Sequence, residues 1–209
     1  RFQGVEPATS SAPYQASPGN HERNCRCAQI SKTSHFEVYQ KKFAMPGSRI
    51  SNPKRGSGNN MWFSYDLGPV HWLSFSTETD YPGAPSGETA NRNSNMTQLE
   101  WIARDLAAVD RRKTPFVIAV GHRPLYANGE CDSNGEPKGQ AKIVHDTFFP
   151  LFSRYNVDLY ITGHVHDYQR THRLQNSSIT QILAGAGGSI EGLSKEPKRS
   201  YSWLAFEYN

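Results

Sequence analysis

Residues 115–122, Pro-Phe-Val-Ile-Ala-Val-Gly-His, are the stretch that decides the fold of this chain. A continuous apolar run such as Phe116 to Val120 is typical of a strand covered on both faces. The glycine that follows permits a sharp turn, and the histidine then stands at the carboxyl edge of the predicted sheet. Residues 157–164 repeat the pattern and also end in Gly-His. The sequence therefore predicts two neighbouring parallel strands, each followed by a histidine.

Helical and strand periodicities alternate around these two strands, which is typical of an α/β domain. Thr97 and Glu100 form a capping box before a helix, and residues 34–37 suggest a second capping box. Gly68-Pro69 indicates a hairpin between two strands. Pro150 is expected to kink or restart the helix that contains it. The other predicted elements are a helix at 141–155 and strands at 61–67, 70–77, 179–184 and 203–208.

Residues 78–95 are rich in Pro, Gly, Asn and Ser. This composition predicts a long surface connection between the hairpin and the next helix. Connections of this length are uncommon unless they carry a function or pack against a partner.

The two Gly-His pairs predict a metal site. Open α/β sheets bind their ligands at the carboxyl edge of the strands, so His122 and His164 are expected within reach of one ion. His166 lies two residues further along and is expected to reach a second ion. Imidazole suits iron, zinc and manganese. The four histidines without such a pattern are interpreted as hydrogen-bonded core residues: His35, His71, His145 and His172.

Charge and hydropathy exclude other classes of protein. The formal charge is +4, but the basic residues are scattered, and the longest cluster, residues 111–113, ends a predicted helix, where cations are favoured. We therefore expect no specific nucleic-acid partner. No apolar stretch approaches the ~18 residues of a membrane-spanning helix. The first residues lack signal-peptide architecture, so any targeting segment is expected upstream.

Cysteines and glycosylation patterns favour a secretory compartment. Asn95 and Asn176 each begin an Asn-x-Ser/Thr acceptor pattern. Cys25 and Cys27 are too close together for the usual zinc hook. We expect one disulfide from Cys131 to Cys25 or Cys27. The third cysteine would then be a free thiol or pair with a cysteine that this sequence does not contain. A secreted, lysosomal or vacuolar location would fit these patterns.

Four short motifs in order carry a family resemblance: Gly19-Asn20-His21-Glu22, Val120-Gly121-His122-Arg123-Pro124, Gly163-His164-Val165-His166 and Gly185-Ala186-Gly187-Gly188. Their order resembles the calcineurin-like metallophosphoesterases. Ser17-Pro18 and residues 167–170 narrow the resemblance to purple acid phosphatases. It implies an αββα sandwich, with mixed sheets flanked by helices. Residues 1–209 would form the carboxy-terminal portion of one catalytic domain, with its amino-terminal half absent.

The resemblance also implies a dinuclear metal centre of Fe(III) with Zn, Fe or Mn. Asn20, His122 and His164 would bind the divalent ion, and His166 the ferric ion. His21 would contact the phosphoryl group or protonate the leaving alcohol. Two cations ~3.5–4 Å apart would hold a phosphate monoester and activate water for its hydrolysis at acidic pH.

Two departures from the family pattern stand out. The aspartate motifs that supply most ferric ligands are missing, and residues 1–18 contain no aspartate. The 209 residues alone are therefore expected to be inactive, with the missing half as their partner. The segment after Pro124 lacks the paired histidines of some plant members, and Gln169 stands where glutamate is usual. Substrate preference is therefore left open.

Three functions are compatible with these observations. The first is an acid phosphatase acting on phosphate monoesters in the complete protein. The second is a non-catalytic fragment that acts as an interaction or assembly unit, including as a homo-oligomer. The third is a phosphodiesterase or nucleotide pyrophosphatase of the same superfamily.

Overall fold

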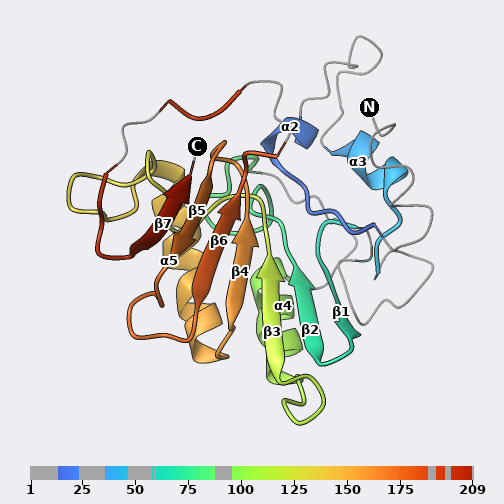
Figure 1. Cartoon of the computed structure of the whole chain (residues 1–209). Coiled ribbons are helices and arrows are strands. Elements are labelled where there is room, and N and C mark those ends of the chain that lie inside the picture. Colours follow the sequence, from blue (N-terminus) through green and yellow to red (C-terminus); the bar gives the residue numbers. More distant parts are fainter. Residues whose placement is uncertain are drawn as a thin grey trace.

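The computed structural model describes residues 14–23, 36–46, 58, 60–87, 96–187, 192–195 and 199–208. Within them, seven strands form one mixed sheet in the order β1-β2-β3-β4-β6-β5-β7 (Figure 1). The strands are β1 (Phe63–Leu67), β2 (Val70–Ser74), β3 (Phe116–Val120), β4 (Leu159–Thr162), β5 (Tyr168–Thr171), β6 (Thr180–Ala184) and β7 (Leu204–Tyr208). The helices are α2 (Asn20–Arg23), α3 (Glu37–Lys42), α4 (Gln98–Ala107) and α5 (Gly139–Arg154).

The centre of the sheet is parallel, as the two Gly-His stretches predict. β2, β3, β4 and β6 pair in parallel, with Val120 of β3 opposite Ile161 of β4. β1 pairs antiparallel with β2 through Gly68-Pro69, which confirms the hairpin. β5 pairs antiparallel with both β6 and β7. The α/β fold class is confirmed, with a mixed sheet.

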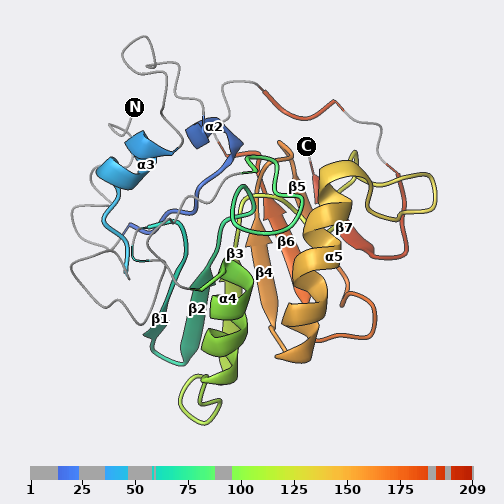
Figure 2. The same cartoon turned by 180° about the vertical axis from the view of Figure 1, so that it is seen from behind.

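Helices α4 and α5 lie together on one face of the sheet, behind it in Figure 1 and in front of it in Figure 2. Val117, Ala119 and Tyr160 point toward these helices and are fully or almost fully buried. The core between the layers is aromatic, with Phe75 in contact with the rings of Phe148, Phe152 and Tyr160 at centroid distances of 4.7, 5.3 and 5.6 Å. Burial of such rings is the main apolar contribution to the stability of this layer.

The opposite face of the sheet carries apolar side chains that are less well covered. Ile118, Val120, Ile161 and Ile182 are partly exposed, and Phe116 is 54% exposed. None of the described helices lies over this face. The prediction that β3 and β4 are covered on both faces is therefore wrong for the described residues. The apolar runs arise because both sets of alternating residues are apolar, although only one set packs against helices.

Several local predictions can be compared with the structure. The capping box of Thr97 and Glu100 is present at the start of α4. α3 begins after Phe36, a residue with φ 59° and no side-chain cap, and the first two residues of the predicted capping box at 34–37 lie outside the described residues. α5 continues through Pro150 without a break. Among the described residues, no helix is both long and apolar enough to cross a membrane.

The beginning of the predicted surface connection is buried. Glu78 and Thr79 are each 1% exposed and Tyr81 is 8% exposed. Gln98 of α4 holds this turn, because its amide accepts from the backbone of Ser76 and donates to the carbonyls of Ser76 and Thr79. The prediction of an exposed connection is thus wrong for its first part. Residues 88–95 lie outside the described residues.

Candidate metal centre

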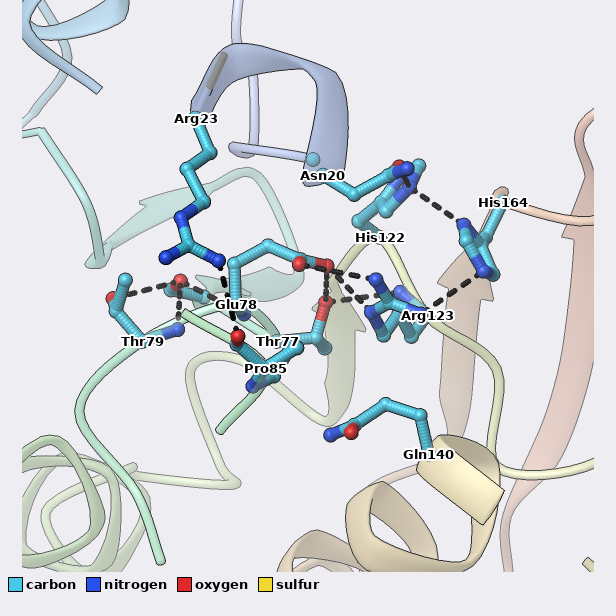
Figure 3. A network of polar contacts seen from close by, with 12 residues as sticks. Asn20, Arg23, Thr77, Glu78, Thr79, Pro85, His122, Arg123, Gln140 and His164 are labelled. Carbon is cyan, nitrogen blue, oxygen red and sulfur yellow. Dashed lines mark hydrogen bonds and ion pairs between the residues drawn. The ribbon is translucent and has the colours of Figure 1, made fainter. Parts of the chain in front are cut away.

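His122 and His164 lie side by side because they follow neighbouring parallel strands. Gly163 donates its backbone N–H to the carbonyl of His122 at 3.0 Å, and the Thr162 hydroxyl donates to the same carbonyl at 2.7 Å. The two imidazole rings have centroids 4.9 Å apart and planes at 72° (Figure 3). The carboxyl edge of the sheet thus brings together the two histidines that the sequence pairs.

The backbone around His164 is tightly constrained. His164 has φ 72°, in the left-handed region that residues with a side chain rarely adopt. Gly185 packs against the same turn, and a Cβ at this position would lie 1.9 Å from the carbonyl oxygen of Val165. Only glycine fits there without movement of the backbone. The Gly185 motif therefore shapes the turn that carries His164 and His166; Gly188, its last residue, lies outside the described residues.

Asn20, the first residue of α2, completes a group of three polar atoms. Its Oδ1 lies 2.6 Å from Nε2 of His122, and the same Nε2 lies 3.1 Å from Nδ1 of His164. Gly19 allows this approach, because a Cβ there would lie 2.9 Å from the ring of His122. One amide oxygen and two imidazole nitrogens therefore converge on one point.

The electrostatics of this group favour neutral imidazole. Burial, together with the nearby His164 and Arg123, lowers the pKa of His122 to about 3. No carboxylate contacts His122 among the described residues, so its ring keeps a lone pair even in acid. Two imidazole nitrogens and an amide oxygen are a donor set for a divalent ion of borderline hardness, such as zinc or ferrous iron. The residues present thus fit one divalent metal ion.

An ion pair lies on the outer side of His164. The Arg123 guanidinium donates to both carboxylate oxygens of Glu78, at 2.8 and 3.2 Å, and its Nη1 lies 3.0 Å from Nε2 of His164. Burial raises the pKa of Glu78, and Arg123 partly offsets this effect. Glu130 lies near the same Nε2, with its Oε1 at 3.5 Å. No role for Glu78, Arg123 or Glu130 was predicted from the sequence. The signal that could have found Arg123 is its place directly after His122.

His166 and His21 are not part of the convergent group. His166 contacts the carbonyl of Gly192 through Nδ1 at 3.1 Å, and its backbone N–H donates to Ser194. His21 is exposed on α2, next to Asn20. The described residues contain no group of three His, Cys, Asp or Glu side chains arranged to hold a metal. The structure therefore brings together Asn20, His122 and His164, and leaves His166 and His21 beside them.

The predicted modification sites fall partly within the described residues. Asn176 is exposed in a turn, with φ 58°. Cys131 is buried, and burial raises the pKa of its thiol to about 11. Asn95, Cys25 and Cys27 lie outside the described residues, as does His35. The predicted disulfide therefore stays a prediction.

Comparisons with known proteins agree with one another. A model of the family described as calcineurin-like phosphoesterase matches residues 3–168. Acid phosphatase A of Cryphonectria parasitica is 33% identical over 92% of the chain and 45% of its own length. Purple acid phosphatase 23 of Arabidopsis thaliana is 31% identical over 90% of the chain and 36% of its own length.

Among solved structures, the purple acid phosphatase PPD1 from yellow lupin seeds superposes with a TM-score of 0.71 and 25% identity. That superposition covers 99% of this chain and 36% of the lupin chain. The chain thus spans less than half the length of these relatives.

Proposed function

Because the chain belongs to the calcineurin-like phosphoesterase family, we propose that it is part of an acid phosphatase that hydrolyses phosphate monoesters with a dinuclear metal centre. The relatives named as acid and purple acid phosphatases support this reaction. The observation that carries the proposal is the convergence of Asn20, His122 and His164 on one point.

These three residues are proposed to hold the divalent ion, through Oδ1 of Asn20, Nε2 of His122 and Nδ1 of His164. His166 is proposed as a ligand of a second, ferric ion, and the divalent ion would be Zn, Fe or Mn. When bound, such cations act as Lewis acids on the phosphate ester and on water. Further ligands would come from residues that this sequence does not contain, since residues 1–18 include no aspartate.

The protein residues around the ions have separate tasks. The turn of Gly163 to His166 and the close packing of Gly185 fix the direction of the His164 ring. His21 is exposed beside Asn20, where a bound ester would be accessible to it. In its protonated form, His21 would donate its proton to the leaving alkoxide, a contribution of roughly 10²–10⁴-fold when well placed.

We place residues 1–209 in one catalytic domain, supported by the single sheet that the described strands form. The partly exposed face of β3, β4 and β6 is the proposed packing surface for the remaining portion of that domain. The alternative is that a second copy of the chain packs on this face and forms a homo-oligomer. Analytical ultracentrifugation of the 209-residue chain, with and without the preceding natural residues, distinguishes the two arrangements.

A secretory location is proposed from the acceptor patterns and the cysteines. Asn176 is exposed and therefore accessible to glycosylation. A disulfide from Cys131 to Cys25 or Cys27 is proposed with it. Intact mass before and after deglycosylation and reduction tests both modifications.

Replacement of one proposed ligand tests the assignment most directly. In the longest natural protein that carries this chain, His164→Ala should remove the divalent ion and nearly all hydrolysis of an aryl phosphate near pH 5. His145→Ala is the control, because His145 packs on Phe149 and contacts Tyr126 away from the convergent group. Similar metal content and turnover in the two variants would contradict the ligand assignment.

Replacement of His21 tests the proton donor. His21→Ala should leave the metal content unchanged and slow alkyl phosphates more than aryl phosphates, because an aryl leaving group hardly needs the proton. Equal losses for the two substrate classes would exclude proton donation and leave a role in phosphate binding.

The 209-residue chain by itself is proposed to bind one ion weakly and to lack competent turnover. Metal affinity falls steeply when ligands and their supporting hydrogen bonds are removed. Purified chain loaded with iron and zinc should show neither an acid phosphatase rate comparable with a complete enzyme nor a tyrosinate-to-iron absorption band. Either observation would show that the site is complete within these residues.

A further inference from the structure

The orientation of His164 creates a hydrogen-bonding requirement on its outer side. Nδ1 is the ring nitrogen that lies 3.1 Å from Nε2 of His122, so it is the nitrogen proposed to face the divalent ion. A histidine that binds a metal through one nitrogen carries its hydrogen on the other and usually donates it to a carboxylate or carbonyl. In the metal-loaded protein, Nε2 of His164 therefore needs an acceptor.

Arg123 cannot be that acceptor. Its Nη1 is 3.0 Å from Nε2, but a guanidinium has only donors. The contact is a hydrogen bond from Arg123 to His164 only when Nε2 carries no hydrogen and the ring hydrogen is on Nδ1. Arg123 is held in place by its two hydrogen bonds to Glu78, a side chain 1% exposed. The structure thus favours the tautomer of His164 that cannot bind a metal through Nδ1.

Glu130 can accept the hydrogen. Its Oε1 lies 3.5 Å from Nε2 of His164, and its side chain is 24% exposed, so water competes only partly for the carboxylate. The backbone of Glu130 is fixed, because its N–H donates to the carbonyl of Ala127 and its own carbonyl accepts from Lys138. A formed hydrogen bond is shorter than 3.5 Å, and a small rotation of this flexible side chain would close the gap.

On the basis of the proposed function, we propose that Glu130 is a positioning residue for the divalent ion. Its carboxylate accepts Nε2–H of His164 and so stabilises the tautomer that leaves the Nδ1 lone pair free for the metal. Binding then moves one hydrogen within His164: Nδ1 releases a proton to solvent, Nε2 takes one up, and the ring stays neutral. Arg123 turns away from Nε2 and keeps the shorter of its two hydrogen bonds to Glu78, from Nε to Oε1.

Cobalt binding measures this role without reference to turnover. In the longest natural protein that carries this chain, Glu130→Ala should weaken Co²⁺ affinity at the divalent site about 10–100-fold, measured by chelator competition. Glu130→Gln should lose less, because an amide oxygen still accepts. Glu136→Ala is the matched control, since Glu136 is exposed in the same loop. Unfolding midpoints of the metal-free variants establish that each is folded. If Glu130→Ala does not fold, the comparison is made with Glu130→Gln.

Proton NMR of the Co²⁺ protein provides a second readout. The ring N–H of a bound histidine gives a shifted, exchangeable signal, and nuclear Overhauser contacts with the neighbouring Arg123 side chain identify the signal of His164. That signal should exchange faster with solvent in Glu130→Ala and remain unchanged in Glu136→Ala. Unchanged affinity and exchange in Glu130→Ala would overturn the role of Glu130. Retention of Co²⁺ by His164→Ala would instead overturn the proposed metal site, so the two failures are distinguishable.

Discussion

Two histidine clusters lie at opposite edges of the same sheet and have opposite chemistry. His122 and His164 follow the carboxyl ends of β3 and β4, whereas His71 lies at the beginning of β2, level with Val117 of β3. Both ring nitrogens of His71 contact carboxylates, Asp66 at 2.7 Å and Asp105 at 3.0 Å. In contrast, His122 contacts an amide oxygen and another imidazole.

The partners decide the charge of each ring, although burial lowers the pKa of both. Burial lowers the pKa of His71, but the hydrogen bonds and charges of Asp105 and Asp66 outweigh it and raise the pKa above its usual value. Below about pH 6.5, His71 is therefore an imidazolium that donates through both nitrogens and has no lone pair for a metal. His122, with its pKa lowered to about 3, keeps that lone pair. The neighbours of a histidine, more than its burial, therefore distinguish a member of an ion pair from a metal ligand.

The largest expected effect separates the clusters by metal binding. In the longest natural protein, His122→Ala should weaken divalent-metal affinity by more than about 100-fold, because even outer supporting residues cost 10–100-fold. His71→Ala should leave metal content unchanged. Metal analysis after dialysis against a weak chelator measures both. Loss of metal in the His71 variant would show that the two clusters do not differ in metal binding.

The second effect separates the clusters by stability. His71→Ala leaves the carboxylates of Asp66 and Asp105 facing each other without the cation. It should lower the free energy of unfolding by about 2–3 kcal/mol, less than a fully buried pair, because Asp66 is 46% exposed. Urea unfolding measures this loss. His172 is exposed, so its interpretation as a core histidine is wrong, and His172→Ala should change stability by less than about 0.5 kcal/mol. Equal stability of the two variants would contradict the proposal that His71 stabilises the fold.

The third effect is a pH dependence that only the His71 cluster should give. Because the folded-state pKa of His71 is raised, its stabilisation is complete below the unfolded value of about 6.5 and is lost as pH rises through the folded value. Arg104, Asp110 and Lys113 are the other charged residues that line the same cavity. The stability difference between wild type and His71→Ala should therefore shrink above about pH 6.5. A difference that grows with pH would contradict the imidazolium.

The smallest effect ranks the two carboxylates. Asp105 is 14% exposed and also accepts from the Ser64 hydroxyl at 2.7 Å, whereas Asp66 is 46% exposed. Asp105→Asn should cost about 1–2 kcal/mol and Asp66→Asn less than about 1 kcal/mol. Thermal unfolding near pH 5.5, where His71 is charged, gives the order. The reverse order would mean that solvent screening does not determine how much Asp66 and Asp105 each contribute to stability.

The parts of the fold that follow from local patterns could be predicted from the sequence. The strand-Gly-His repeat predicts β3, β4 and the meeting of His122 with His164, because parallel neighbours place their carboxyl ends at one edge. β5 escaped prediction because its inward residues, Gln169 and Thr171, are polar. Gln169 is buried through hydrogen bonds to the backbone N–H of Asn128 and the side chain of Asp167, which no hydrophobic periodicity reveals.

The surroundings of the site depend on contacts between distant residues. Glu78 contacts Arg123 from the turn that follows β2, and Glu130 approaches His164 from a loop. Neither pairing leaves a trace in local spacing. His71 shows the same limit, because its interpretation as a core histidine gave its burial but not its two carboxylates.

The sheet face that α4 and α5 leave uncovered has a consequence for optical experiments. Trp72 lies on that face and stacks on Tyr65, with ring centroids 6.3 Å apart and planes at 9°. Trp62 and Trp101 are buried, at 2% and 6% exposure, while Trp203 lies at the far side of the sheet, bonded to the Gly135 carbonyl. In a Trp203→Phe background, Trp72 is thus the fluorophore most sensitive to what covers the face. A blue shift of its emission and lower acrylamide quenching would show, as a function of time, when another polypeptide covers this face.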